Sequence, residues 1–494
     1  MSWISWVIFL GVSHVIQATK KNVLVLMIDD LKVTESFKEI NSYTPNLDKF
    51  SQHSYTFQNA HAQFPMCGPS RASILTGLLP SRLRIYINNN GPQICDYRRK
   101  VEKRPYTFQT LNEAFTRQGY ETRGLGKIYH KGTGQKSSCG DETAAIHNRW
   151  SKSTLFQVWS PWKQVDWNVP DKFNTKAEGC PVYQFMDVKP ELEDDLYLDM
   201  NMTNLAIQEL QELTTQSRPW FFFMGFRKPH LPYIAPKRFW DLFEGYKFKP
   251  PTTRISRSLR RFKPFTREDT QYKRKTPKHD FIKMAKGYYA CVAYVDELVG
   301  RVLQTLEESG KKNDTIIVVT SDHGYHVGEH GFWAKHTVLE NALRVPLMIY
   351  DSRVGSGTSH APVELLDLFP TLVDLAGLDA SNIQPLDGVS LKPLMNGSKQ
   401  WVKPFARSYW RFGSQFFKSK RSMRYRYVKR NSRQTALIDF KTDPDEKSDL
   451  KKKRWGIYKK LARASMMKSS SSMPPDFKPD QPAFYKSGFS LVPT

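Results

Sequence analysis

Hydrophobic residues form four short uninterrupted runs along this chain, separated by segments in which they recur with helical spacing. The runs are Val23–Ile28, Trp220–Phe223, Ile316–Val319 and Val345–Tyr350. Runs of this kind are typical of strands that are buried on both faces. The segments with helical spacing are Phe108–Gln118, Met202–Leu213 and Ala285–Glu307. Strands that alternate with helices predict an α/β fold in which helices cover a central sheet.

The pattern changes after about residue 405. Arg424–Val428 and Ala436–Phe440 are predicted to be short strands of a small antiparallel sheet, and the turn-forming Asp443-Pro444-Asp445 follows them. From Ala464 the chain is rich in Ser, Met, Pro and Lys, which predicts a poorly packed tail. We therefore divide the chain into a signal peptide (1–18), a main domain (19–405), a small C-terminal α+β subdomain (406–463) and a basic tail (464–494).

The first residues suggest export from the cytosol. Trp3–Val15 is almost entirely apolar and Thr19-Lys20-Lys21 follows it. Because a bilayer span needs about 20 apolar residues, this run reads as a signal peptide cut near Ala18. A buried first strand or an uncleaved anchor is the alternative. No later segment is long and apolar enough to span a membrane, so we expect a protein of the secretory pathway, lysosomal or secreted, without a stable membrane span.

Export would permit glycans and disulfide bonds. Three tripeptides are glycosylation acceptors, at Asn201, Asn313 and Asn396. The chain has only five cysteines, too few for a disulfide scaffold. If Cys67 is reserved for chemistry, we favour Cys139–Cys180 as the single bridge. Cys291 lies in an apolar helical segment and is expected to be a buried thiol.

The chain carries a strong net positive charge. The chain has 494 residues, 39% of them hydrophobic, which is typical of a globular protein, and its net charge is +26. Basic residues cluster at Arg254–Lys278, Arg421–Arg430 and Lys451–Arg454. Basic surfaces attract polyanions, and sulfated polysaccharide is the polyanion that an exported protein meets most readily. The chain shows no nucleic-acid-binding module, so we expect no nucleic-acid partner. A merely solvated surface is the alternative.

Three of the apolar runs end in residues that can do chemistry. Asp29 and Asp30 follow the first run, His230 follows the second, and Asp322 and His323 follow the third. Ligands of open α/β sheets bind beyond the carboxyl ends of the strands, so these side chains should converge. Carboxylates that share a pocket need a cation, and oxygen ligands without cysteine favour calcium or magnesium. Helix capping by the acids is the alternative.

The segment Cys67–Gly77 carries the most specific motif. It reads C-x-P-S-R and then x-x-x-L-T-G, and here the chain resembles the type I sulfatases of the alkaline phosphatase superfamily. Further elements shared with that family cover most of the chain: Gly126–His130 (G-K-x-x-H), Lys228–His230 (K-P-H), Thr320–Lys335 and Leu366–Leu372. The spacing of G-K-I-Y-H and the run from Ser321 to Lys335 are most similar to the iduronate-2-sulfatase subgroup.

The resemblance implies a fold and a nucleophile. The fold would be a large mixed β-sheet sandwiched by helices, as in alkaline phosphatase and the sulfatases, and 19–405 would be the catalytic domain. In this family a formylglycine-generating enzyme oxidises the motif cysteine, here Cys67, to formylglycine in the endoplasmic reticulum. Its hydrate is the nucleophile that attacks sulfur. The second hydroxyl of that hydrate lets sulfate leave, which a plain serine or cysteine could not achieve.

The resemblance also implies a role for each matching residue. One calcium ion would be held by Asp29, Asp30, Asp322, His323 and the modified Cys67, although many relatives carry Asn in place of the histidine. Arg71 would hold the nucleophile, and Lys127 and Lys335 would neutralise the sulfate oxygens. The departing alcohol would be protonated by His230 or Lys335. The second hydroxyl would lose its proton to His130.

The resulting hypothesis is a sulfuric ester hydrolase that removes sulfate from a sulfated glycan, specifically the 2-O-sulfate of uronic acid in heparan or dermatan sulfate. Two alternatives remain: a sulfatase with another glycan specificity, and a catalytically silent protein that binds glycosaminoglycans through its basic surface. A phosphatase of the same superfamily fits less well, because it would need two metals and a Thr or Ser nucleophile.

Overall fold

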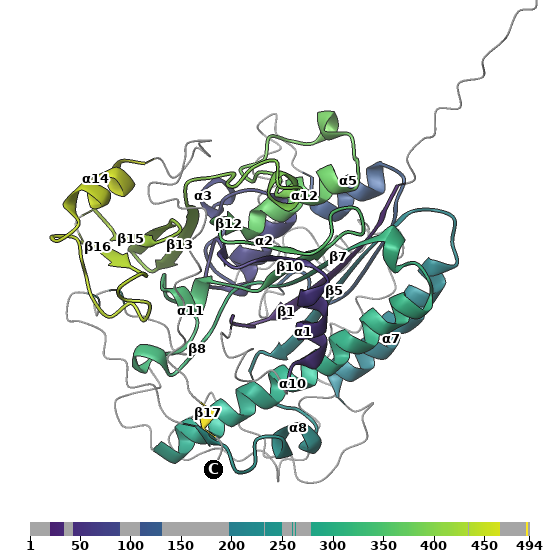
Figure 1. Cartoon of the computed structure of the whole chain (residues 1–494), viewed down its shortest axis with the longest axis horizontal. Coiled ribbons are helices and arrows are strands. Elements are labelled where there is room, and N and C mark those ends of the chain that lie inside the picture. Colours follow the sequence, from purple (N-terminus) through teal and green to yellow (C-terminus); the bar gives the residue numbers. More distant parts are fainter. Residues whose placement is uncertain are drawn as a thin grey trace, which may run out of the picture.

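A seven-stranded mixed β-sheet lies at the centre of the molecule (Figure 1). The computed structural model describes residues 20–33, 43–88, 109–130, 197–231, 233–248, 259, 262, 278–432, 434–464 and 491–492. The strand order is β11-β2-β10-β7-β1-β5-β4. The strands are β1 (Asn22–Asp29), β2 (Tyr55–Phe57), β4 (Glu121–Gly126), β5 (Trp220–Pro229), β7 (Thr315–Ser321), β10 (Leu347–Tyr350) and β11 (Gly357–Ser359). The predicted α/β class is confirmed.

The four strands β7, β1, β5 and β4 run parallel, and β10 pairs antiparallel with β7. All four apolar runs of the sequence therefore form strands of this sheet. Residues of β1 alternate between its two faces: Leu24, Leu26 and Ile28 belong to one hydrophobic cluster. Val23, Val25 and Met27 belong to the cluster on the other face. Because both faces are covered, the strand reads as an unbroken apolar run.

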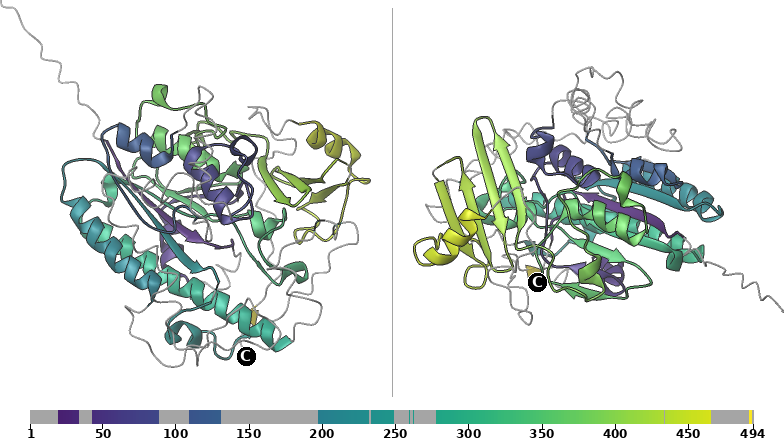
Figure 2. Two further views of the ribbon diagram at one scale, coloured as in Figure 1. Left: turned by 180° about the vertical axis from the view of Figure 1, so that it is seen from behind. Right: turned by 90° about the horizontal axis from the view of Figure 1, so that it is seen from above.

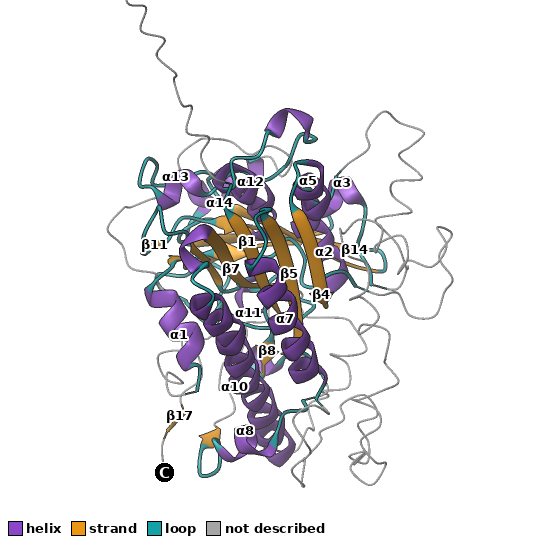
Figure 3. Ribbon diagram, turned by 90° about the vertical axis from the view of Figure 1, so that its right-hand side faces the viewer, coloured by secondary structure: helices purple, strands orange, loops and turns teal. Residues whose placement is uncertain are grey.

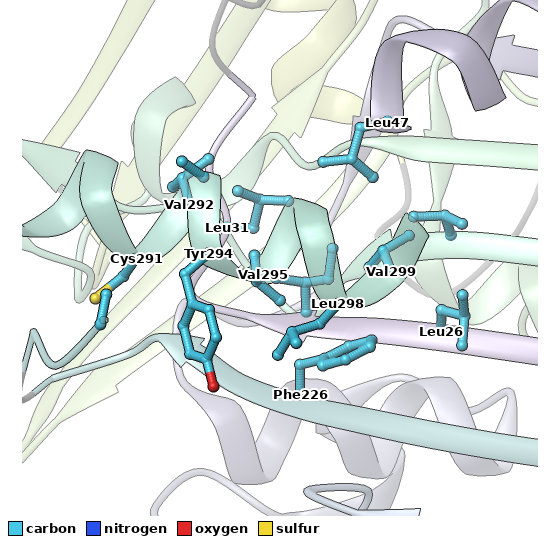
Figure 4. Packing of buried hydrophobic residues seen from close by; sticks show 14 of the residues in the cluster. Leu26, Leu31, Leu47, Phe226, Cys291, Val292, Tyr294, Val295, Leu298 and Val299 are labelled. Atoms are coloured by element: carbon cyan, nitrogen blue, oxygen red, sulfur yellow. The ribbon is translucent and has the colours of Figure 1, made fainter. Parts of the chain in front are cut away.

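Helices form a layer on each face of this sheet (Figures 2 and 3). One layer contains α1 (Pro45–Gln52), α7 (Leu198–Thr214), α8 (Lys237–Asp241) and the long α10 (Lys278–Glu308). The other contains α2 (Cys67–Thr76), α5 (Leu111–Arg117), α12 (Leu368–Leu375) and α13 (Lys392–Met395). Figure 4 shows Val295, Leu298 and Val299 of α10 beside Leu26 and Phe226 of the sheet.

A second sheet lies beside this core and has four antiparallel strands: β13 (Ala406–Phe412), β14 (Gln415–Arg421), β15 (Tyr425–Arg430) and β16 (Gln434–Asp439). The sequence predicted only its last two strands. One face packs on the main body, where α11 (Glu340–Leu343) contributes Leu343. The other face is covered by α14 (Trp455–Arg463) through Leu461.

The remaining elements are short. They are β3 (Ala60–His61) with β12 (Val363–Glu364), β6 (Lys247–Phe248) with β17 (Leu491–Val492), β8 (His326–Val327) with β9 (Trp333–Ala334), the helix α3 (Pro80–Leu83), and the 3₁₀ helices η6 (Lys312–Asp314), η7 (Glu329–Gly331), η8 (Leu365–Asp367) and η9 (Ala380–Asn382).

Several sequence predictions concern single residues or ends. Cys291 is buried and free, as predicted. The proposed bridge between Cys139 and Cys180, the signal peptide (1–18) and most of the tail (465–490) lie outside the described residues. The three predicted glycosylation acceptors, Asn201, Asn313 and Asn396, are exposed. No helix within the described ranges has the length and hydropathy that a bilayer span requires.

Candidate active site

The carboxyl ends of β1, β5 and β7 bring together the acids and histidines that the sequence singled out. Asp29 is the last residue of β1 and Asp30 follows it, with a positive φ of 63°. His230 follows β5, and Asp322 and His323 follow β7. Four of these side chains are buried; the side chain of His230 is 23% exposed. The predicted convergence therefore exists, because parallel strands end at a common edge.

The nucleophile candidate enters this edge from a helix. Cys67 is the first residue of α2 and is buried. Its Sγ lies 3.3 Å from Nε2 of His323, 3.3 Å from Nζ of Lys335 and 3.6 Å from Nζ of Lys127. This atom marks the position that an oxygen of the oxidised side chain would take. Burial raises the pKa of the thiol, and Asp29 adds to that effect, so an unmodified Cys67 is a poor nucleophile.

Arg71 lies one helical turn after Cys67 and holds two of the acids. Its Nη2 donates to Oδ1 of Asp29 at 2.9 Å, and its Nε donates to Oδ2 of Asp322 at 2.8 Å. Burial opposes the charge of the guanidinium, but Asp322 and Asp29 outweigh it and raise the pKa of Arg71. The planar fork therefore fixes the two carboxylates relative to α2.

Two lysines place their amino groups close to Cys67. Lys127 follows β4 and its Nζ donates to Oδ2 of Asp29. Lys335 donates from Nζ to Oδ1 of Asp30 at 2.6 Å. Burial raises the pKa of Asp29, yet Lys127 and Arg71 more than offset this and hold that pKa well below its usual value. Burial prevails at Asp30 and raises its pKa to about 7, against the effect of Lys335.

Two histidines of the site, His130 and His323, are held in the neutral form. Burial, followed by the charge of Lys127, lowers the pKa of His130 to about 3, and no partner among the described residues faces its Nδ1. Burial lowers the pKa of His323 to about 4. Nδ1 of His323 lies 3.0 Å from the carbonyl oxygen of Gly324. A proton on Nδ1 therefore leaves the lone pair of Nε2 for the site, 3.4 Å from Oδ1 of Asp30.

The donor set suits a hard divalent cation. Asp29, Asp30, Cys67 and His230 each offer one ligand atom within 4.8 Å of the others, and so do Cys67, Asp322 and His323 as a second group. Three buried carboxylates supply half of these donors, and carboxylate oxygens are the ligands that calcium and magnesium prefer. The chemistry of this donor set fits the predicted calcium ion. His230 joins the potential ligands, although the sequence suggested it only as a proton donor.

Supporting residues were missed by sequence reasoning. The hydroxyl of Tyr288 donates to the carbonyl oxygen of Asp30 at 2.8 Å, and Ser321 Oγ donates to the carbonyl oxygen of His323 at 2.8 Å. Asn88 accepts from the backbone N–H of Gly68 at 2.9 Å. Ser321 lies inside the Thr320–Lys335 block and could have been found there. Tyr288 lies in an apolar helix and looks like any core tyrosine.

Comparison with known proteins identifies the class. The Sulfatase family model matches residues 21–378, so the chain belongs to the sulfatase family and is a sulfuric ester hydrolase. A second model, N-sulphoglucosamine sulphohydrolase, C-terminal, matches residues 328–468. The same family includes relatives that act through a metal and a formylglycine, and the buried cluster around Cys67 is consistent with both.

The relatives differ in the substrates that their names give. The chain is 32% identical over 432 residues to human iduronate 2-sulfatase, with 78% of this chain and 74% of the relative covered. It is 29% identical over 454 residues to choline-sulfatase of Rhizobium meliloti, with 87% and 82% covered. A sulfatase of Formosa agariphila is 31% identical over 386 residues, with 74% and 71% covered.

Solved structures confirm the alkaline phosphatase/sulfatase-like fold. A phosphonate monoester hydrolase of Agrobacterium radiobacter has a TM-score of 0.66 at 20% identity, with 90% of this chain and 94% of that chain covered. A 2-O GAG sulfatase has a TM-score of 0.63 at 20% identity, with 90% and 91% covered. The predicted sheet sandwich with a small C-terminal sheet is therefore correct.

Proposed function

We propose that this sulfatase removes the 2-O-sulfate of uronic acid residues in heparan or dermatan sulfate, using formylglycine made from Cys67 and one calcium ion. The observation that carries the proposal is that Cys67 Sγ lies 3.6 Å from Nζ of Lys127 and 3.3 Å from Nζ of Lys335, beside a buried carboxylate cluster. The identity to human iduronate 2-sulfatase supports the choice of sugar.

Asp29, Asp30, Asp322 and His323 would hold the calcium ion. When bound, calcium supplies a Lewis acid that takes up negative charge from the sulfate. Arg71 keeps Asp29 and Asp322 in place through its two hydrogen bonds. Lys335 and Lys127 neutralise the sulfate oxygens that lie next to the reacting atom.

We assign proton transfer to two histidines, His230 and His130. The side chain of His230 is 23% exposed, and its Nε2 lies 3.9 Å from Oδ2 of Asp30. We assign it the protonation of the departing alcohol, shared with Lys335. His130 is neutral and its Nδ1 has no partner among the described residues. It is therefore free to accept the proton whose removal releases sulfate.

The proposal also includes export to the lysosome or the extracellular space and glycosylation at Asn201, Asn313 and Asn396. Formylglycine formation requires passage through the endoplasmic reticulum, so the two parts belong together. The exposed position of all three asparagines supports glycan attachment. Digestion of secreted protein with a peptide N-glycosidase, followed by mass spectrometry of the three peptides, tests each acceptor separately.

Mass spectrometry of the tryptic peptide 50–71 tests the nucleophile. Protein from a eukaryotic host should show the mass change for replacing the CH₂SH group of Cys67 with CHO. The protein should then hydrolyse an aryl sulfate, and Cys67→Ala should not. An intact thiol in a host that converts another sulfatase, together with no turnover, would favour the silent glycan-binding alternative.

A substrate panel tests the specificity. Disaccharides that end in 2-O-sulfated iduronate or glucuronate should be desulfated faster than 6-O-sulfated glucosamine and faster than choline sulfate. Choline sulfate belongs in the panel because a choline-sulfatase is among the relatives. Preferred turnover of either comparison compound would reject the uronate assignment and leave the sulfatase activity standing.

A further inference from the structure

The helix α14 presents a basic surface on the outer side of the four-stranded sheet, away from the seven-stranded sheet (Figures 1 and 2). Its inner face is apolar: Ile457, Tyr458 and Leu461 pack against Phe405 and Tyr427. The packing fixes the helix on the sheet and determines which side chains face solvent. Residues 451–464 contain seven basic residues and no acidic one.

The basic side chains of this segment point outward. Six of them are exposed, namely Lys452, Lys453, Arg454, Lys459, Lys460 and Arg463. Among the residues that the structure describes, no carboxylate forms an ion pair with any of the six. Elsewhere in the same sheet, cations are neutralised: Arg407 pairs with Glu364 and Arg421 with Glu340. The charge of α14 is therefore available to an external anion.

An exposed aromatic platform lies within this charge. Trp455 is 52% exposed and its ring stacks on Tyr458, with ring centroids 4.9 Å apart and an interplanar angle of 15°. The amino group of Lys459 lies 5.4 Å from the centroid of the Trp455 ring. Trp and Tyr supply a large contact area at little entropic cost. A rigid, half-exposed indole among cations suits a partner that combines ring faces with negative charge.

We propose that the outer face of α14 is an accessory binding surface for sulfated glycan chains, separate from the active site. Lysines act as point charges and tolerate the varied sulfate positions of such a chain, while Trp455 packs against a sugar ring. The choice of a sulfated glycan rests on the proposed function, because such a polymer would also be the substrate. Binding there would retain the polymer near the enzyme and lower KM for long chains without changing the chemical step.

Heparin binding by the full-length protein tests this surface. The variant Lys453→Ser/Lys459→Ser removes two charges from it, and Trp455→Ala removes the ring. The matched control Lys49→Ser/Lys399→Ser removes two exposed charges elsewhere. We expect the α14 double variant to raise the Kd for heparin roughly tenfold and to weaken its salt dependence, and the control to change Kd by less than about twofold. Trp455→Ala should raise Kd at unchanged charge.

Turnover of a small aryl sulfate should be the same in all variants, because none of the substituted residues lies in the active site. Equal heparin affinity in the α14 variant and the control would overturn the proposal. Duplex DNA or phosphatidylserine vesicles that bind as tightly as heparin, with the same loss in the variant, would overturn the choice of a glycan. An inactive wild-type protein would instead reject the proposed function, and the heparin comparison would still be decisive for this surface.

Discussion

At the scale of single residues, Lys335 contacts both a carboxylate of the candidate metal site and the candidate nucleophile. Its Nζ donates to Asp30 and lies next to Cys67 Sγ. We predict that Lys335→Ala lowers kcat by about 100- to 1000-fold, because a positive charge is lost where negative charge develops. Steady-state kinetics on an aryl sulfate measure this. Cys67 should still be converted, because the conversion motif lies far from Lys335 in the chain, and peptide mass spectrometry checks that control. A kcat within about twofold of wild type would contradict the role.

Asp30 allows a test of the calcium site that does not depend on activity. We predict that calcium raises the Tm of the protein above its value in EGTA, because the ion binds the folded state and relieves repulsion among three buried carboxylates. Asp30→Asn should abolish this shift. Asparagine tolerates the positive φ of this position, so the backbone need not change.

Thermal unfolding with and without calcium measures the effect. Asp48→Asn on α1, outside the site, serves as the control and should keep the full shift. If Asp30→Asn responded to calcium as strongly as wild type does, the ion would have to bind elsewhere.

At the scale of elements, the pairing of β4 with β5 sets the position of Lys127. Its backbone N–H donates to the carbonyl oxygen of Gly225 at 2.8 Å, and a Cβ at Gly225 would lie only 1.9 Å from the carbonyl oxygen of Lys127. We predict that Gly225→Ala displaces Lys127 and lowers kcat at least about tenfold, because small displacements near the reacting atoms are costly.

Gly456→Ala in α14 is the matched control for this substitution. Among the described residues, no atom beyond the chain neighbours and the backbone of α14 itself lies within 4 Å of a Cβ at Gly456. Alanine should therefore raise stability by about 0.5–1 kcal/mol and leave kcat unchanged. Kinetics and thermal unfolding of both variants give the comparison. Normal kcat in Gly225→Ala would show that the close approach of β4 and β5 does not position Lys127.

Some strands could be predicted from the sequence and others could not. β1, β5 and β7 were predicted because strands buried on both faces are apolar throughout, and the acids at their ends followed from the geometry of parallel sheets. β13 and β14 were missed because they carry charged residues that are nevertheless buried. Arg407 of β13 pairs with Glu364, and Arg421 of β14 pairs with Glu340. A polar pattern does not reveal that its charges are neutralised by residues distant in the chain.

The same limit applies to the active site. The family motifs supplied the residues of the Cys67 cluster, but a motif does not identify supports such as Tyr288, which reaches Asp30 from the middle of α10. Its position depends on how α10 crosses the ends of the strands, and local sequence does not encode that crossing. The roles assigned to the individual site residues are predictions, which the experiments described above test.

At the scale of the whole molecule, a buried ionic network joins the four-stranded sheet to α11 and to the short strand β3. Glu340 of α11 accepts from Arg426 and from Arg421, the latter at 3.2 Å, and lies 3.3 Å from Nε2 of His61. Oε2 of Glu446 accepts from the backbone N–H of Glu340 at 2.7 Å. Burial raises the pKa of Glu340, but Arg421 and Arg426 outweigh it and hold that pKa well below its usual value. The network therefore contains one firmly ionised carboxylate and a second one beside it.

The second carboxylate should make the stability of this junction depend on pH. Burial raises the pKa of Glu446 from 4.5 to about 7, against the effect of Arg426. Because the folded state then binds the proton more tightly than the unfolded state, this group stabilises the fold fully below pH 4.5, and the contribution is lost as pH rises to about 7. We predict that the Tm of Glu446→Gln, which stays neutral, rises relative to the Tm of wild type as pH increases from about 5 to about 8.

Thermal unfolding at both pH values measures this difference in Tm. Glu308→Gln, on the exposed end of α10, is the control, and its Tm should differ from that of wild type by the same amount at each pH. If the difference for Glu446→Gln were equal at both values, or smaller at the higher one, Glu446 would already be ionised at the lower pH, and the junction would rest on a fully charged network.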